Sequence, residues 1–347
     1  MNTLGKIFRV SLFGESHGPA AGAVLDGIPP GLPLAEGDFE ADLVRRRSGA
    51  AGTTDRKEPD LPELLSGLYG GRTTGTPVCI VFRNRDTRSE DYAPLASVPR
   101  PGHADFSGSV RYRGFQDPRG SGHFSGRITV GLVAAGVVAK KLIPGAIFTT
   151  RVLAAAGDPD VEAAALAASK AGDSAGALVE VRVSGIPAGL GEPFFDPVDG
   201  RIAAAVFAVP GVRGVEFGDG FAAARMRGSE HNDPILSRDG RTSRNGAGGV
   251  NGGITNGNEI VVHIAVKPAS SIRVPQRTLD FDSGRITELS VPGRHDACIG
   301  LRAAVVLEAA CAVCLADFAL LARTYDAAAP GEQGYEEERH EAGTFEG

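Results

Sequence analysis

Two short stretches of the sequence pair a histidine with other side chains that could transfer a proton. In GESHG (14–18), Ser16 and His17 lie between glycines directly after an apolar strand pattern. In RPGHADF (100–106), His103 and Asp105 lie in a segment bounded by proline and glycine. Histidine exchanges protons near neutral pH, and flanking glycines allow a backbone to approach a ligand closely. Each stretch is also compatible with an ordinary turn that carries an incidental histidine.

A third stretch, RGSGHFSGRITVG (119–131), combines glycines with a histidine, two serines, Arg119 and Arg127. The apolar residues that follow it predict a buried helix over 129–143, so the glycine loop would lie at a helix N-terminus. Free backbone amides favour an anion there, and arginine binds phosphate or carboxylate through two parallel hydrogen bonds. The stretch lacks the lysine and spacing of a Walker loop. We expect an anion site here, with a serine nucleophile as the alternative.

The C-terminal half contains a fourth group of polar and glycine-rich stretches. These are SRNGAGGVNGGITNG (243–257), KPASSI (267–272) and GRHDACIGLR (293–302). Paired glycines are typical of a backbone that lies against a flat or phosphorylated ligand. Arg294, His295 and Asp296 offer charge and proton transfer within three residues, although an ion-pair cluster on the surface also explains those three.

The elements that would position these stretches are mostly strands. Alternating or continuous apolar patterns predict strands at 7–14, 22–27, 77–84, 177–184 and 259–266, and helices at 35–47, 129–143 and 301–324. Several strands have connections like those of hairpins, so the fold class is mixed α/β or α+β with largely antiparallel sheets. We expect one domain over 1–325, followed by a polar, acidic and disordered tail over 326–347.

The composition excludes several classes of protein. The formal net charge is −6 and tryptophan is absent, which argues against binding to nucleic acid. No apolar run approaches the ~20 residues of a membrane span, and the N-terminus lacks a signal-peptide pattern, so we expect a cytoplasmic protein with no membrane partner. Cys311 and Cys314 form a CxxC inside an alanine-rich helical pattern. They are predicted to be small core residues rather than a redox or metal site.

In their order along the chain, these stretches resemble the chorismate synthase family over essentially residues 1–325. The matching stretches are FRVSLFGESHG, LDGIPPGLPL, DLVRRRSG, RKEPD, SGLYGGRTTGTPV, RPGHADF, DPRGSGHFSGRIT, GIPAGLGEPFFD, GVEFGDGF, MRGSEHND, GGVNGGITNG, KPASSI and GRHDACIGLRA. So many independent motifs in one order make a chance resemblance negligible. The resemblance implies an α+β fold, a β-α-β sandwich with helices enclosed between two antiparallel sheets, assembled as a homotetramer.

The resemblance also implies a reaction. The family converts 5-enolpyruvylshikimate 3-phosphate to chorismate and phosphate by anti-1,4-elimination, the last step of the shikimate pathway, and requires reduced FMN; NADPH is a candidate reductant. The substrate carries a phosphate and two carboxylates, which agrees with arginines in glycine loops. Two alternatives are a phosphate-eliminating lyase that works without flavin and a flavin-binding protein without catalysis.

Carried over by position, the resemblance implies that His17 protonates the leaving phosphate and His103 the reduced flavin. Ser16, Ser125 and Asp296 would relay a proton from flavin N5. The residues expected to bind FMN are His123, Phe124, Ser125, Pro210, Gly211, Gly252, Lys267, Pro268, Ala269, Ser270, Ser271 and Arg294. Those expected to bind the substrate or NADP are Arg46, Arg119 and Arg127. Pro210 and Gly211 match a segment that reaches the flavin of a neighbouring subunit.

The chain departs from the family pattern in two places. The family loop usually reads GGGRSSARET, whereas this chain has GSGHFSGRIT, with His123 in place of an arginine. The histidine could replace part of the charge on the flavin. The segment after RRR (45–47) is also shorter and lacks a further arginine, so we expect Arg46 to carry more of the substrate contact.

Overall fold

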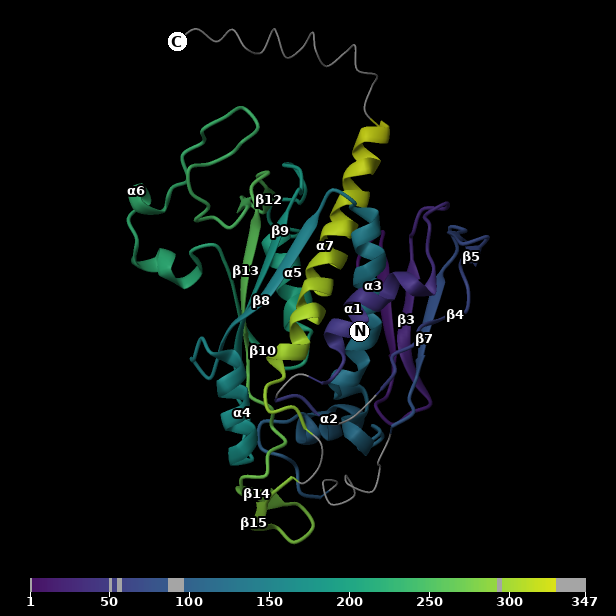
Figure 1. Cartoon of the computed structure of the whole chain (residues 1–347), viewed down its shortest axis with the longest axis vertical. Coiled ribbons are helices and arrows are strands. Elements are labelled where there is room, and N and C mark those ends of the chain that lie inside the picture. The colour runs from purple at the N-terminus through teal and green to yellow at the C-terminus, as the bar shows by residue number, and fades with distance from the viewer. Residues whose placement is uncertain (1, 50–51, 55–57, 87–96, 292–294, 329–347) are drawn as a thin grey trace, which may run out of the picture.

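Two antiparallel sheets enclose the main helices in the computed structural model, which describes residues 2–49, 52–54, 58–86, 97–291 and 295–328 (Figure 1). The first sheet has the strand order β1 (Thr3–Leu4), β2 (Arg9–Gly14), β3 (Ala20–Asp26), β7 (Val78–Arg83) and β4 (Glu63–Leu64). The second has the order β10 (Val212–Phe217), β13 (Ile260–Val266), β9 (Ala177–Ser184) and β8 (Ile147–Ala155). The predicted α+β sandwich is therefore confirmed.

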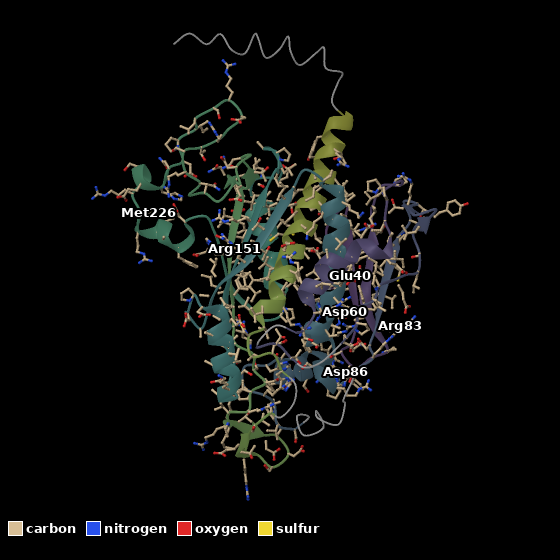
Figure 2. All side chains as sticks on the ribbon, viewed as in Figure 1. Glu40, Asp60, Arg83, Asp86, Arg151 and Met226 are labelled. Atoms are coloured by element: carbon tan, nitrogen blue, oxygen red, sulfur yellow. The ribbon has the colours of Figure 1, made fainter. Side chains whose placement is uncertain are left out.

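The helical layer between the sheets consists of four helices: α1 (Glu40–Arg46), α3 (Thr129–Leu142), α5 (Val198–Phe207) and α7 (Gly300–Ala328). Helix α3 packs on β2, β3 and β7, and α7 packs on β8 and β9, while the two helices pack against each other. Helix α1 contacts both, and α5 packs between α7 and β10. Side chains on the outer side of the sandwich include the exposed Arg83 on β7 and Arg151 on β8 (Figure 2).

The remaining described elements are short helices and hairpins outside this sandwich. They are η1 (Glu36–Phe39), α2 (Asp105–Tyr112), η3 (Arg119–Phe124), η4 (Gly126–Ile128), α4 (Val161–Ala171), η5 (Gly220–Arg225), α6 (Gly228–His231), and the strand pairs β5 (Leu68–Tyr69) with β6 (Arg72–Thr73), β11 (Val250–Asn251) with β12 (Ile254–Thr255), and β14 (Gln276–Asp280) with β15 (Arg285–Leu289). Helix α2 was not predicted.

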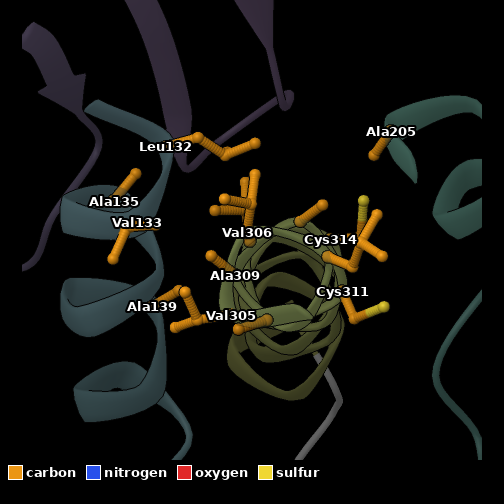
Figure 3. Packing of buried hydrophobic residues seen from close by; sticks show 14 of the residues in the cluster. Leu132, Val133, Ala135, Ala139, Ala205, Val305, Val306, Ala309, Cys311 and Cys314 are labelled. Carbon is orange, nitrogen blue, oxygen red and sulfur yellow. The ribbon is translucent and has the colours of Figure 1, made fainter. Parts of the chain in front are cut away.

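Small residues bring α3 and α7 into close contact. In Figure 3, Ala139 of α3 faces Val305 of α7. A Cβ atom on Gly136 would lie 2.4 Å from the Cβ of Ala309, closer than two carbon atoms can approach. The alanine- and glycine-rich composition of both helices therefore reflects interhelical packing, and the predicted burial of 129–143 is confirmed.

Helix α7 is a core helix. By length and composition it could cross a membrane, contrary to the sequence analysis, but 83% of its apolar window is buried inside the protein. Cys311 and Cys314 lie on the side of α7 that faces α5, and both are fully buried (Figure 3). Burial raises the pKa of the Cys314 thiol to about 12, so the predicted core role of the pair is confirmed. The helix ends at Ala328, four residues past its predicted end at 324, and residues 329–347 of the predicted tail lie outside the described residues.

Candidate active site

A cavity of about 1020 Å³ opens beside the N-terminal ends of α3 and α7. Its walls come from β2, the end of α1, the turns at 100–104 and 120–129, the connection between α5 and β10, residues 267–271 and the start of α7. The predicted site residues that line it are Ser16, Arg46, His103, His123, Phe124, Ser125, Arg127, Pro210, Gly211, Lys267, Pro268, Ala269, Ser270, Ser271 and Asp296. The fold thus gathers residues from both halves of the chain around one space.

Two buried arginines share one carboxylate at the base of this cavity. Asp60 is 2% exposed and lies in the interior in Figure 2. Its Oδ2 accepts a hydrogen bond from Arg46 Nη1 at 2.9 Å, and its Oδ1 accepts from Arg127 Nη1. Burial alone would raise the pKa of Asp60, but Arg46 and Arg127 hold it below its usual value, so the group is a carboxylate.

The two arginines differ in what they have left to offer a ligand. Arg46 also donates from Nη2 to the carbonyl oxygens of Gly126 and Arg127, at 2.9 and 3.2 Å, so it holds the loop before α3. Arg127 donates from Nε to Asn84 Oδ1 at 2.8 Å, and its buried Nη2 has no partner among the described residues. A buried guanidinium N–H without an acceptor is costly, so Arg127, unlike Arg46, keeps a donor that no described residue satisfies.

The turn that carries Ser16 and His17 packs against the glycine loop. Gly120 has a φ of +57°, and a Cβ atom there would lie 2.5 Å from His17 Cδ2 and 2.9 Å from Ser16 Oγ. The Ser16 amide donates to the Gly122 carbonyl at 3.0 Å. Glycine is therefore required at 120 both by the backbone conformation and by the space that the histidine ring occupies.

His103 belongs to a charged cluster with Arg100 and Asp105. The Nδ1 atom of His103 lies 2.7 Å from Asp105 Oδ1, and Arg100 binds the same carboxylate through Nε at 2.8 Å and Nη2 at 2.7 Å. Burial would raise the pKa of Asp105, but the hydrogen bonds from Arg100 and His103 lower it well below its usual range. The Asp105 carboxylate stabilises a proton on His103 Nδ1 and leaves Nε2 for a ligand.

The loop before α3 positions three predicted residues. His123 Nδ1 lies 2.8 Å from the Gly14 carbonyl, which can only accept, so Nδ1 carries the hydrogen. Phe124 packs against Tyr112 with a centroid distance of 6.0 Å. Ser125 Oγ accepts from the Arg127 amide at 3.3 Å and keeps its own hydrogen available to a ligand.

The rim formed by 267–271 contacts the turn at 100–104. Lys267 Nζ donates to the Gly102 carbonyl and to Ser270 Oγ, the latter at 2.9 Å. Burial, helped by Arg213, lowers the pKa of Lys267. Ser271 Oγ accepts from Arg100 Nη1 at 2.9 Å. This rim presents amine and hydroxyl groups beside the apolar Pro268 and Ala269.

Asp296 is held at the start of α7. Its carboxylate accepts from Arg302 Nη1 at 2.9 Å and from the Thr54 amide at 2.8 Å. Arg302 Nε also donates to the carbonyl of Arg46 at 2.9 Å, so it joins Asp296 to the end of α1.

Four predicted residues are not found in the cavity wall. His17 is one of them, although its ring lies against Gly120, which does line the cavity. Within the described part of the chain, Arg119 pairs with Asp117 and its side chain is 51% exposed, and Gly252 lies in the turn between β11 and β12. Arg294 lies outside the described residues. Pro210 and Gly211, expected to reach a neighbouring subunit, line the cavity of their own chain.

The sequence analysis missed Asp60, Asn84, Arg100 and Arg302. Asp60 and Arg100 lie inside or beside stretches that were quoted, RKEPD and RPGHADF, but no local pattern shows that they pair with residues far along the chain. Arg302 is likewise the last residue of the quoted stretch GRHDACIGLR, whereas Asn84 lies at the end of a predicted strand and in none of the polar stretches.

The fold is an α+β sandwich, and its cavity is lined by buried arginines and half-buried histidines, an arrangement typical of an enzyme that acts on a small molecule. The family model of chorismate synthase matches residues 8–320, and the chain belongs to the chorismate synthase family. It is 56% identical to the chorismate synthase of Chitinophaga pinensis over 322 residues, which cover 92% of this chain and 97% of that protein. It is 46% identical to the chorismate synthase of Leptothrix cholodnii, covering 93% and 90%.

A crystal structure of a chorismate synthase superposes with a TM-score of 0.68 at 28% identity, covering 91% of this chain and 92% of that one. The resemblance inferred from the motifs is confirmed. The chain is accordingly a lyase of the final step of the shikimate pathway, from a flavin-dependent family that acts on a small molecule.

Proposed function

We propose that this chain eliminates phosphate from 5-enolpyruvylshikimate 3-phosphate by anti-1,4-elimination to give chorismate, with reduced FMN bound in the same cavity. The observation that carries the proposal is Arg127. Its guanidinium is buried and fixed at Nε and Nη1, and its Nη2 lacks an acceptor among the described residues beside a cavity of about 1020 Å³. An anionic group of the substrate would supply that acceptor.

We propose that the substrate and FMN occupy this cavity together. Pockets for a single small molecule span ~300–1,000 Å³, and this cavity lies at the upper end of that range. Lys267, Ser270 and Ser271 would hold polar groups of FMN, and Pro268 with Ala269 would cover its rings. A Cβ atom on Gly126 would meet no atom within 4 Å, so this wall leaves open space where a side chain would intrude. When bound, reduced FMN would supply electron density and an acceptor for the C6 hydrogen.

Two histidines would hold the protons that the reaction needs. A phosphate dianion is a poor leaving group unless it is protonated, and His17, in the turn that packs on the loop of Arg127, would act as its acid. His103, with Nδ1 bound to Asp105, would hold a proton at Nε2 toward the cavity. Ser16, Ser125 and Asp296 line the cavity and would pass protons between ligand and solvent.

The predicted arginines take unequal parts in this proposal. Arg127 would contact the substrate directly, whereas Arg46, whose donors bind Asp60 and two loop carbonyls, would act mainly by holding that loop. Arg119, exposed and paired with Asp117, would meet an anion only at the entrance. Arg294 and Lys267 would bind FMN. Gly252 would also contact FMN, and in the proposed homotetramer Pro210 and Gly211 would reach the flavin of a neighbouring subunit.

An anaerobic assay tests this proposal. Protein with chemically reduced FMN and 5-enolpyruvylshikimate 3-phosphate should release chorismate and phosphate in equal amounts, and the His17→Ala protein should release them about 10²–10⁴-fold more slowly. Turnover with no flavin would favour the flavin-independent lyase, and FMN binding without turnover would favour the non-catalytic flavoprotein. Adding NADPH to oxidised FMN then shows whether the chain reduces its own flavin. We also propose a cytoplasmic location, where NADPH is available.

A further inference from the structure

We infer that Asn84 is a positioning residue that couples the anion-binding Arg127 to the turn carrying Ser16 and His17. This inference rests on the proposed function, because it concerns the distance between the group that binds the substrate and the group that protonates it. Asn84 directly follows β7 and is half-buried.

Asn84 makes three side-chain hydrogen bonds, and together they fix the orientation of its amide. Nδ2 donates to the carbonyl of Glu15 at 3.0 Å and to that of Gly18 at 2.7 Å. Oδ1 accepts from Arg127 Nε at 2.8 Å. Carbonyls only accept and a guanidinium only donates, so a flipped amide would satisfy none of the three bonds. The side chain therefore closes the GESHG turn across both of its ends and binds the arginine at the same time.

Asp60 fixes a second nitrogen of the Arg127 guanidinium, independently of Asn84. Asp60 binds Arg127 at Nη1, and Asn84 binds it at Nε, so Nη2 is the nitrogen left to point at a ligand. The turn of His17 is attached to the same amide. Asn84 is thus the side chain that joins the guanidinium to the His17 turn, in addition to the backbone bond from Ser16 to Gly122.

Few other side chains could meet these requirements at this position. An aspartate keeps an acceptor for Arg127. It replaces the Nδ2 donor by a carboxylate oxygen, which cannot donate to the carbonyls of Glu15 and Gly18 and is repelled by their oxygens. An alanine removes all three hydrogen bonds at once. Asn84→Asp therefore removes only the bonds to the GESHG turn, whereas Asn84→Ala removes the bond to Arg127 as well.

The expected results follow from this difference. In Asn84→Asp, Arg127 keeps its partner, so KM for the substrate should stay within about threefold, while kcat falls by about 10–100-fold because the His17 turn is displaced. In Asn84→Ala, kcat should fall and KM should rise as well. Displacements of about 1 Å are sufficient for losses of this size.

A matched control is available in the loop before β13. Asn258 donates from Nδ2 to the Gly240 carbonyl at 3.0 Å and accepts from the Thr242 amide at 3.1 Å, so it clamps a turn in the same manner as Asn84. Among the described residues it does not line the cavity. Asn258→Asp should leave kcat and KM within about twofold of the wild type while making the same chemical change.

The experiment measures kcat and KM with pre-reduced FMN for the wild type and the three variants, with thermal melting as a check of folding. A loss of kcat with nearly constant KM in Asn84→Asp supports the coupling. Unchanged kinetics, a rise in KM alone, or a lower melting temperature with normal kcat would each overturn it. If Asn84→Asp does not fold, unchanged kcat in Asn84→Ala would overturn it equally. A wild type without turnover would instead refute the proposed function.

Discussion

Replacing Glu308 by glutamine should destabilise the protein by an amount that depends on pH. Glu308 lies on α7 and is 1% exposed, and it joins three other elements. Its oxygens accept hydrogen bonds from Arg45 of α1 at 2.8 and 2.6 Å, from Lys140 of α3, and from Thr150 of β8 at 2.6 Å. Glutamine has nearly the same shape, so the substitution removes the charge without leaving a cavity.

The size of the effect follows from the pKa of Glu308. Burial would raise it, but the hydrogen bond from Arg45 and the charge of Lys140 lower it from an ordinary 4.5 to about 2. At about 1.4 kcal/mol per pKa unit, this corresponds to about 3 kcal/mol of stabilisation. Breaking a buried ion pair typically costs about 3–5 kcal/mol. We expect the lower end, because Asp42 also pairs with Arg45 and Lys140.

The sign of the pH dependence is fixed by the lowered pKa. The stabilisation is fully present above the unfolded-state pKa of about 4.5 and is lost as the pH falls toward 2. Urea unfolding at one protein concentration should therefore show Glu308→Gln to be about 3 kcal/mol less stable at pH 7, with the difference shrinking below pH 4.5. A difference that stays the same at all pH values would refute the electrostatic explanation.

A surface carboxylate provides the control for this experiment. Glu40 binds Arg47 at 3.0 and 3.2 Å, but its side chain is 58% exposed. Glu40→Gln should cost at most about 1 kcal/mol, because solvent screens exposed ion pairs.

Three further predictions concern the site. His17→Ala and His103→Ala should each lower turnover with pre-reduced flavin by about 10²–10⁴-fold while FMN still binds, as followed by flavin fluorescence, and near-normal turnover would remove that residue from the mechanism. Gly120→Ala should lower turnover at least about tenfold because its Cβ would displace His17, whereas Gly37→Ala, where a Cβ meets nothing within 4 Å, should not. Asp60→Ala should lower the free energy of unfolding at pH 7 by about 3–5 kcal/mol, because it leaves Arg46 and Arg127 buried without their shared carboxylate. Added phosphate should then raise the melting temperature of Asp60→Ala more than that of the wild type. Equal increases in melting temperature would contradict the role of Asp60 as the partner of both arginines.

The sandwich could be predicted from sequence to the extent that its elements carry a continuous apolar pattern. Helix α3 is apolar almost all round, which indicates an enclosed helix, and this burial is observed. Helix α2 was missed for a physical reason. Gly108 in its middle suggests a loop, but a Cβ atom there would lie 2.6 Å from Phe124 Cε2, so the glycine serves packing rather than flexibility.

The site could be predicted only as separate stretches. GESHG and RPGHADF each mark a turn with a histidine, and the structure places both beside one cavity or in its wall. The two arginines of the glycine loop looked equivalent in the sequence. Arg119 has a partner two residues away in Asp117, whereas the partners of Arg127 lie 43 and 67 residues away. Such distant pairs leave no periodic signal, so the sequence could not show which arginine is buried.

The charged residues of α7 show how these distant pairs hold the site together. Arg302 donates to the carbonyl of Arg46 at the end of α1, and Glu308 accepts from the side chain of Arg45. Asp317 accepts hydrogen bonds from three consecutive backbone amides at 6–8, just before the strand that leads into the GESHG turn. A buried charge is tolerated only with partners, so each of these residues fixes a segment of the N-terminal half against the central helix. The turn of His17 and Arg46 of α1 are therefore both anchored to α7, which limits their movement relative to each other.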